Sequence, residues 1–201
     1  MAKSIDLFKL LPLIAVFVYC YVSGINVGVA SPGNLTPASG SSPSALRYQV
    51  KNIYDAQVGI KEQTGNNDGK KVEQYLRYVH LTKGQPWCAA FVCWVFGEIK
   101  VHNPRSGWSP ALFPDSKVIW QRARLQPATH NPEPKPGDVF GIYFPEKKRV
   151  AHAGFIDEWG EKYAITVEGN TNIAGSREGD GVYRKRRLTS SLYQVSNWID
   201  H

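Results

Sequence analysis

The chain has 201 residues, of which 42% are hydrophobic, and this is enough to form one domain with a hydrophobic core. Its formal net charge of +7 suits an anionic partner, such as a cell wall, a lipid surface or a nucleic acid, without choosing among them. Only three cysteines are present, and one of them lies in the leader described below, so the composition excludes a domain stabilised by a disulfide framework.

The N-terminal segment, residues 1–30, has the features of a secretory signal. Met1–Lys9 carries two lysines, Leu10–Val22 is apolar, and Gly28–Ala30 supplies the small residues of a cleavage site. We therefore predict cleavage after Ala30. The alternative is an uncleaved membrane anchor, because the apolar segment is long enough to span a bilayer. In both cases we expect an exported protein of the periplasm, the cell envelope or the medium, with membrane contact only if the leader stays attached.

A flexible tether is expected at residues 31–44, which are rich in serine, proline and glycine and contain no charge. The folded domain then comprises residues 45–201. Apolar residues that share one helical face predict two helices. The first contains Leu46, Val50, Ile53 and Tyr54 and ends near Gly59. The second contains Val72, Tyr75, Leu76 and Val79. The segment Thr64–Lys71 between them is interpreted as a turn, because the alternating carboxylates of a calcium loop are absent.

The segment Gln85–Lys100, QPWCAAFVCWVFGEIK, predicts a helix that is buried on most sides, because Ala89–Phe96 offers no polar face. Pro86 suits the first helical position, which places Cys88 in the first turn. There the helix dipole favours a thiolate over a thiol and makes the cysteine a better nucleophile. The alternative is that Cys88 is a small core residue, as is expected for Cys93.

Helices come first in the chain and strands come second. A further short helix is predicted from Asp115 to about Arg124, and a proline-rich crossing follows at His130–Gly137. Apolar runs bounded by turn residues predict five strands: Asp138–Phe144, Val150–Asp157, Tyr163–Glu168, Gly181–Leu188 and Tyr193–Ile199. This order indicates an α+β domain in which N-terminal helices pack on an antiparallel β-sheet.

A cysteine becomes a catalyst when a base is held against it and a third group orients that base. His152 is the candidate base, since the small residues beside it on its strand leave the ring open. On the next strand Glu168 and Asn170 are two residues apart, and an antiparallel neighbour can place either of them beside His152. Each residue alone has a simpler structural explanation. Together with Cys88 they predict a site for nucleophilic catalysis by a cysteine.

Four blocks of sequence, PWCAAFVCWVF, PGDVFGIYF, AHAGFI and VEGNTN, resemble in order and separation the CHAP domain, a family of cysteine, histidine-dependent amidohydrolases and peptidases. The likeness covers roughly Tyr54–Tyr183. It implies a papain-like, NlpC/P60-type fold with Cys88 as nucleophile, His152 as base, Glu168 as the orienting group and Asn170 at the site. The implied activity is cleavage of amide bonds in bacterial peptidoglycan, by an endopeptidase or an N-acetylmuramoyl-L-alanine amidase.

The oxyanion of such a reaction is expected to meet the backbone N–H of Cys88, with the side chain of Gln85 as a candidate second donor. Large aromatic residues are candidates for the walls of a groove that binds a glycopeptide: Trp87, Trp108 and Tyr143. The basic run Arg184–Arg187 is interpreted as the solvated edge of a strand rather than a nucleic-acid site.

No metal or other cofactor is expected. No spacing among the cysteine and histidine residues considered matches a zinc site: Cys88, Cys93, His80, His102 and His130. Some relatives in the resembled family bind calcium shortly before the cysteine. Here Asp68 and Glu73 are the carboxylates of that segment, so the resemblance does not extend to calcium.

The sequence leaves two other functions open. One is a catalytically silent module that binds the cell wall, and the other is an amidase or acyltransferase that acts on another γ-linked amide. The intact set of Cys88, His152 and Glu168 argues against the silent module, which has no need of all three. The expected protein is a monomer whose partner is peptidoglycan and which does not bind nucleic acid.

Overall fold

The computed structural model describes residues 42–122, 132–173 and 179–200. The predicted leader, nearly all of the tether, and His130 lie outside these described residues. Helix α1 (Pro43–Asp55) begins within the segment that was predicted to be the end of the tether. Ser42 caps this helix, since its Oγ accepts the backbone N–H of Ala45 at 3.3 Å, and Pro43 suits the first turn. The Ser-Pro pair therefore starts a helix here instead of extending a linker.

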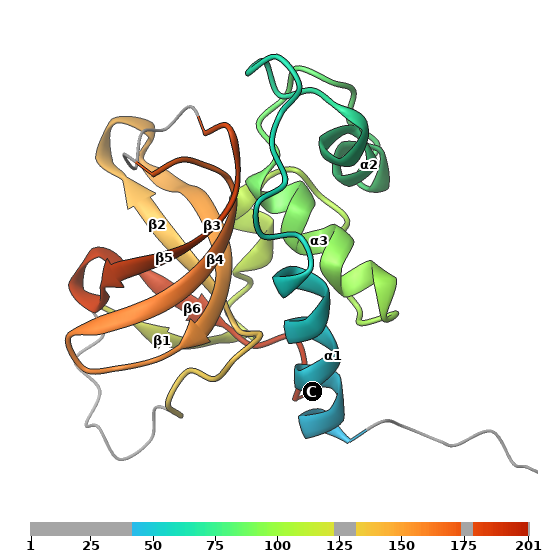
Figure 1. Ribbon diagram of the computed structural model, residues 1–201. Coiled ribbons are helices and arrows are strands. Elements are labelled where there is room, and N and C mark those ends of the chain that lie inside the picture. The colour runs from blue at the N-terminus through green and yellow to red at the C-terminus, as the bar shows by residue number, and fades with distance from the viewer. Residues whose placement is uncertain (1–41, 123–131, 174–178, 201) are drawn as a thin grey trace, which may run out of the picture. The chain divides into compact units, whose positions relative to one another are not determined.

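The helices α1, α2 (Lys70–Tyr78) and α3 (Cys88–Glu98) gather on one side of the sheet, as Figure 1 shows. The predicted apolar faces of the first two helices are buried: Val50 and Tyr54 in α1, and Val72, Tyr75 and Leu76 in α2. Between these helices Asp68 closes the predicted turn, because the backbone N–H and the hydroxyl of Thr64 donate to its carboxylate at 2.9 and 2.8 Å. None of the described helices is long and apolar enough to cross a membrane.

Helix α3 is buried at every residue from Cys88 to Phe96, as the lack of a polar face predicts. The prediction that Pro86 is the first helical residue is wrong, because the helix begins at Cys88. The carbonyl of Trp87 accepts the first helical hydrogen bond, from the N–H of Phe91 at 2.8 Å. Cys88 therefore lies even nearer the helix start than predicted, with its own N–H outside the helical ladder.

The strands of the described residues form one antiparallel, six-stranded sheet in the order β1-β6-β2-β3-β4-β5. Their bounds are β1 (Val118–Gln121), β2 (Val139–Phe144), β3 (Arg149–Glu158), β4 (Tyr163–Thr171), β5 (Gly181–Leu188) and β6 (Gln194–Ser196). The prediction of an α+β domain with an antiparallel sheet is confirmed at this level. Each of the five predicted strands is present, with ends that differ by a few residues.

The predicted helix from Asp115 to Arg124 is wrong, because Val118–Gln121 forms strand β1. This strand pairs with β6, near the far end of the chain, through partners such as Val118 and Ser196. Two β-branched residues and a tryptophan suit such a strand, and the pairing partner is not visible in the local sequence. β6 is shorter than predicted because the side chain of Asn197 accepts the N–H groups of Ile199 and Asp200, which turns the chain.

Two apolar clusters pack on the sheet. The larger lies between helices and sheet, where Phe155 of β3 contacts the rings of Phe91 and Phe96 at centroid distances of 6.0 and 5.3 Å. The smaller contains Phe140, Ile156, Ala164, Leu192 and Val195. Burial of each large side chain contributes about 1.5–3 kcal/mol, so the contact of α3 with the sheet is a main source of stability. The helix that carries Cys88 is thereby fixed against β3 and β4.

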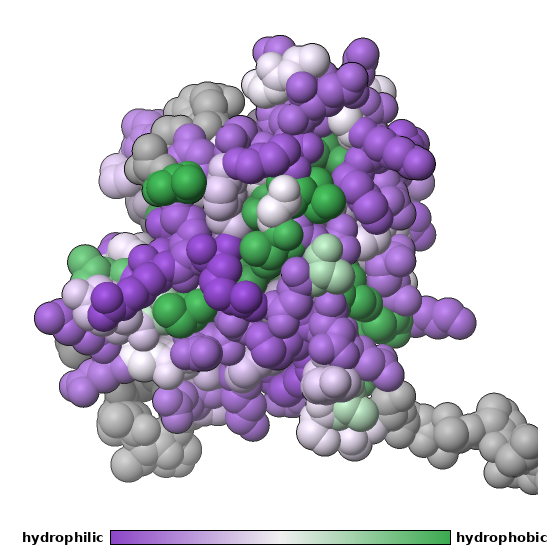
Figure 2. Space-filling model, viewed as in Figure 1, coloured by the Kyte–Doolittle hydropathy of each residue, from purple (hydrophilic) through white to green (hydrophobic). Residues whose placement is uncertain are grey.

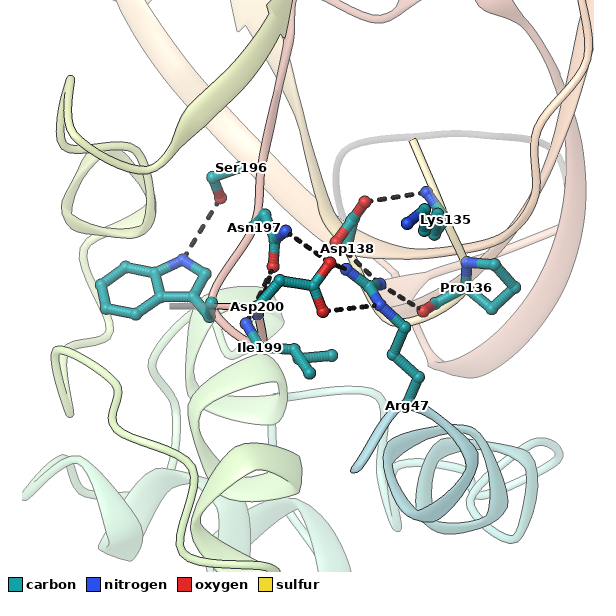
Figure 3. Close-up of polar contacts among 9 residues, drawn as sticks. Arg47, Lys135, Pro136, Asp138, Ser196, Asn197, Ile199 and Asp200 are labelled. Atoms are coloured by element: carbon teal, nitrogen blue, oxygen red, sulfur yellow. Dashed lines mark hydrogen bonds and ion pairs between the residues drawn. The ribbon is translucent and has the colours of Figure 1, made fainter. Parts of the chain in front are cut away.

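Arg47 connects α1 to the start of β2 and to the C-terminal segment (Figure 3). Its guanidinium donates to Asp138 at 2.9 Å, to the carbonyl of Pro136 at 2.8 Å, and to both carboxylate oxygens of Asp200 at 3.1 and 2.7 Å. Asp138 is buried, and this burial raises the pKa of its carboxyl although the charge of Arg47 opposes the shift. The arginine thus ties three distant parts of the chain together.

Hydrophilic residues cover most of the face shown in Figure 2, and hydrophobic residues reach the surface mainly in its middle. Among the described residues the large hydrophobic side chains with the greatest exposure are Tyr48, Val58, Trp108, Ile173 and Leu188. Trp108 is the only tryptophan among these residues.

Candidate active site

Cys88 is the first residue of α3, and its side chain is only 5% exposed. No acidic residue lies in the first turn, and no side chain caps the helix start. The unpaired N–H groups and the positive end of the helix dipole are therefore left to stabilise negative charge on the sulfur. The sequence prediction that Cys88 lies in the first turn is confirmed.

Strand β4 approaches the start of α3 closely because it has a glycine there. A Cβ on Gly169 would lie 2.6 Å from the ring of Trp87 and 2.9 Å from Phe91. The residues on either side of this glycine are Glu168 and Asn170. The missing side chain thus lets the strand that carries both predicted site residues pack directly on the helix that carries Cys88.

His152 of β3 interacts with Cys88, and this interaction shifts the pKa of both groups. Burial acts to raise the pKa of the Cys88 thiol, but the hydrogen bond and positive charge of His152, with a contribution from Ser109, outweigh it and lower the pKa to about 7. Burial acts to lower the pKa of His152, but hydrogen bonds and negative charge from Cys88 and Glu168 raise it to about 9. Because the thiol pKa lies below that of the imidazole, the pair is a thiolate and an imidazolium between these values.

Glu168 of β4 is the third member of this arrangement. Its Oε2 lies 2.9 Å from Nε2 of His152, which leaves Nδ1 of the ring for the sulfur. The spacing along the strand left Glu168 and Asn170 as alternatives for this contact, and the family resemblance implied Glu168. In the structure the contact is made by Glu168. The carboxylate is 0% exposed, so it orients the ring from inside the protein.

Two further residues hold the Glu168 carboxylate. The hydroxyl of Thr166 donates to Oε1 at 2.6 Å, and the guanidinium of Arg187 contacts both carboxylate oxygens. Burial alone would raise the pKa of Glu168, but the hydrogen bonds and charges of Arg187 and His152 keep it well below its usual range. The carboxylate is therefore ionised and fixed, as an orienting group requires.

Sequence reasoning missed Arg187. Its basic run was interpreted as the solvated edge of a strand, and β5 is indeed the terminal strand of the sheet. Arg184 and Arg186 are exposed, but Lys185 and Arg187 are partly buried on the other face of the strand. The alternation of side chains along a strand is the signal that could have separated these two pairs.

Ser109 was also missed. It is the first residue of the 3-10 helix η1 (Ser109–Leu112), it is buried, and its Oγ lies 3.6 Å from the sulfur of Cys88. The irregular segment that contains it gave no periodic signal in the sequence. The contact adds a hydroxyl to the surroundings of the sulfur and helps to lower the pKa of the thiol.

Asn170 lies near the end of β4 with a left-handed backbone conformation, φ 53°, where the register with β5 shifts. Asparagine tolerates this conformation better than most residues. Its side chain is buried, and within the described part of the chain Oδ1 has no hydrogen-bond partner. The structure therefore places Asn170 next to Gly169 at the start of α3, but does not make it the partner of His152.

The predicted groove residues have different surroundings. The interpretation of Trp87 as groove lining is wrong, because it is 0% exposed and its Nε1 donates to Glu62 at 2.8 Å. Gln85 is exposed in the loop before α3. Tyr143 is partly buried and packs on Tyr193 at a centroid distance of 5.1 Å. Trp108 is 53% exposed and directly precedes Ser109, so it remains a candidate for a groove wall.

The arrangement can carry out nucleophilic catalysis: an activated sulfur, a base that holds a proton, and a buried carboxylate that orients the base. Within residues 42–122, 132–173 and 179–200 no group of three His, Cys, Asp or Glu side chains is arranged to hold a metal ion. No protein-family model, curated protein or solved structure was found to match the chain.

Proposed function

We propose that this protein is an exported cysteine hydrolase that cleaves amide bonds of bacterial peptidoglycan. The observation that carries the proposal is the contact of Cys88 with His152 and of His152 with Glu168, with a thiol pKa of about 7 and an imidazole pKa of about 9. A buried structural cysteine has no need of this arrangement, and Cys93 on the same helix lacks it. Burial raises the pKa of Cys93 to about 11.

The resemblance of the sequence blocks to the CHAP domain supports peptidoglycan as the proposed substrate. The same resemblance supports the proposal that the fold is of the papain-like, NlpC/P60 type. Three of those blocks contain the contacting residues Cys88, His152 and Glu168. The predicted leader supports export, and the net charge of +7 suits an anionic cell wall.

In the proposed reaction the thiolate of Cys88 attacks the carbonyl carbon of the scissile amide. The oxyanion is stabilised by the backbone N–H of Cys88 at the helix start, with Gln85 as the proposed second donor. His152 then gives its proton to the leaving amine, which yields a thioester and a free amine. Finally His152 takes a proton from water, which hydrolyses the thioester and regenerates the thiolate-imidazolium pair.

The test is incubation of the purified protein with peptidoglycan sacculi, followed by mass analysis of the soluble fragments. The native protein is expected to release peptides or muropeptides with new amino termini, and Cys88→Ala is expected to release none. Cys93→Ala is the matched control, because it removes a buried thiol from the same helix without touching the site, and it is expected to keep its activity.

Absence of release by the native protein, or equal release by Cys88→Ala, would overturn the proposal. Binding to sacculi without release would favour the silent wall-binding module. Turnover of small γ-linked amides without action on sacculi would favour an amidase or acyltransferase with another substrate. Circular dichroism of each variant shows whether a loss of activity reflects a loss of fold.

A further inference from the structure

Arg149, which is partly buried, and Trp108, which is exposed, form a cation-π pair. The guanidinium carbon of Arg149 lies 4.1 Å from the centroid of the Trp108 ring, and the tryptophan is 53% exposed. Tryptophan is largely buried in most proteins, and Trp87, Trp94 and Trp198 of the same domain are buried. An exposed indole held by a cation is a surface suited to a ligand.

The pair lies beside the candidate catalytic residues. Trp108 directly precedes Ser109, whose hydroxyl is 3.6 Å from the sulfur of Cys88. Arg149 is three residues before His152 on β3, which corresponds to about 10 Å along a strand. Trp108 and Arg149 therefore each lie within three residues, along the chain, of a side chain that interacts with the sulfur of Cys88.

Arg149 also differs from the arginines that stabilise the fold. Arg47, Arg184 and Arg187 each bind at least one carboxylate. Within the described part of the chain Arg149 has no carboxylate partner, and its one polar contact is the carbonyl of Val150 at 3.0 Å. A guanidinium has five N–H donors, so several remain free to bind an anion.

We infer that Trp108 and Arg149 form a subsite for a carboxylate-bearing part of the peptide substrate. The inference rests on the proposed function. The guanidinium lies over the indole ring, and its remaining N–H groups can bind a carboxylate through two parallel hydrogen bonds. Stem peptides of peptidoglycan contain γ-linked glutamate, whose α-carboxyl group is either free or amidated. The subsite distinguishes these two forms and selects the free carboxylate.

The test uses Cys88→Ala, which binds substrate without turning it over, and Cys88→Ser as a second variant in case the first is unstable. Two soluble muropeptides are titrated that differ only in a free glutamate carboxylate or its amide. Isothermal calorimetry is expected to show about tenfold tighter binding of the free carboxylate, the effect of one charge-assisted contact. Adding Arg149→Gln should abolish this preference, and Arg149→Lys should retain part of it.

Arg105→Gln is the matched control. The Arg105 guanidinium also lies over an aromatic ring, that of Tyr78, at 4.8 Å, but Tyr78 packs against Gly97 at the other end of α3. This variant is expected to bind both muropeptides as its parent does. Replacing Trp108 by alanine should weaken the carboxylate preference more than replacing it by phenylalanine, because the phenyl ring still supports the guanidinium.

Equal binding of the two muropeptides, or an equal effect of Arg149→Gln and Arg105→Gln, would overturn the inference. These results are distinguishable from a failure of the proposed function. If the native protein cleaves sacculi but binding does not depend on Arg149, the function stands and the subsite falls. If the preference depends on Arg149 but sacculi are not cleaved, the subsite stands and the hydrolase falls.

Discussion

Arg187 and Glu168 form a two-point contact in which the guanidinium reaches both carboxylate oxygens of the residue that orients His152. Arg187 is contributed by the terminal strand of the sheet, and Glu168 is buried. The contact adds Arg187 to the candidate site and connects the terminal strand, through Glu168 and His152, to the sulfur of Cys88.

Arg187→Met is expected to lower kcat by at least about tenfold on the proposed substrate with little change in KM, because Arg187 positions Glu168 and does not touch the substrate. Arg187→Lys keeps the charge but loses one of the two contacts, so it should have an intermediate effect. Steady-state kinetics on soluble muropeptides measures both constants. Arg186→Met is the control, since Arg186 is on the exposed face of the same strand. An equal loss in both variants would contradict this role.

The Cys88 thiol is expected to titrate near pH 7 in the native protein. Above this pH the thiolate is present, and above about pH 9 His152 loses the proton that the leaving amine needs, so kcat/KM should be maximal between these values. The His152→Ala variant lacks the imidazole that lowers the pKa of Cys88, whereas burial still raises this pKa. The titration of the thiol should therefore move to higher pH. The rate of iodoacetamide alkylation as a function of pH measures it without any substrate.

Cys93 provides an internal control for the alkylation. It is 0% exposed, and burial raises the pKa of its thiol to about 11. Peptide mass analysis should therefore find the label on Cys88 alone in the folded protein. A native midpoint near the ordinary value for cysteine, or equal labelling of both cysteines, would mean that Cys88 is a core residue.

Gly169→Ala is expected to destabilise the domain by about 1–3 kcal/mol, the usual cost of overpacking. Its new Cβ would lie 2.6 Å from the ring of Trp87, so either β4 or the start of α3 must move. That movement separates Glu168 from its partners, and alkylation of Cys88 should slow at pH 7. Urea unfolding measures the free energy. An unchanged midpoint would show that strand and helix do not pack this closely.

Arg47→Met should lower the free energy of unfolding by about 3 kcal/mol at neutral pH, because it leaves the buried Asp138 without its cation. The loss should be smaller near pH 4. Burial already raises the pKa of Asp138 in the folded state, and without Arg47 it rises further, so the folded variant binds a proton more readily than the unfolded chain as the pH falls.

Lys61→Met is the comparison for this variant. The pair of Lys61 with Asp180 is about half exposed on both sides, and exposed pairs contribute about 1 kcal/mol or less. Urea unfolding of the two variants at pH 7 and pH 4 separates a buried from an exposed ion pair. Equal losses at pH 7 would contradict the role of Arg47.

The sequence predicts much of the fold because periodicity is local. The stripes of α1 and α2, the apolar run of α3 and the five predicted strands are all present, since each pattern depends on the residues of its own segment. Strand β1 was wrongly predicted as a helix because its partner, β6, lies more than seventy residues further along the chain. The local sequence of a strand does not show which distant segment it pairs with.

In the candidate site too, features within one segment could be predicted, whereas contacts between distant segments could not. Cys88, His152 and Glu168 could be proposed because each stands at a recognisable place on its own element. Trp87 was wrongly interpreted because a large aromatic residue can line a groove or fill a core, and the sequence does not show that its indole packs against Gly169 in the core. Arg187 was missed because its role depends on the register of β5 with β4, which pairs it with Ala164 and brings it beside Glu168.

Strand β5 pairs with a single strand, β4, and the backbone of residues 59–62 bonds only near its start, around Gly181 and Val182, so the half that carries Arg187 lies at the open edge of the sheet. Terminal elements open more easily than central ones. If β5 separates from β4, Glu168 loses the guanidinium of Arg187 while α3, β2 and β3 keep their packing. The fraction of molecules with a competent site is therefore set by the local stability of this edge, and activity should be lost on heating before the apolar core melts.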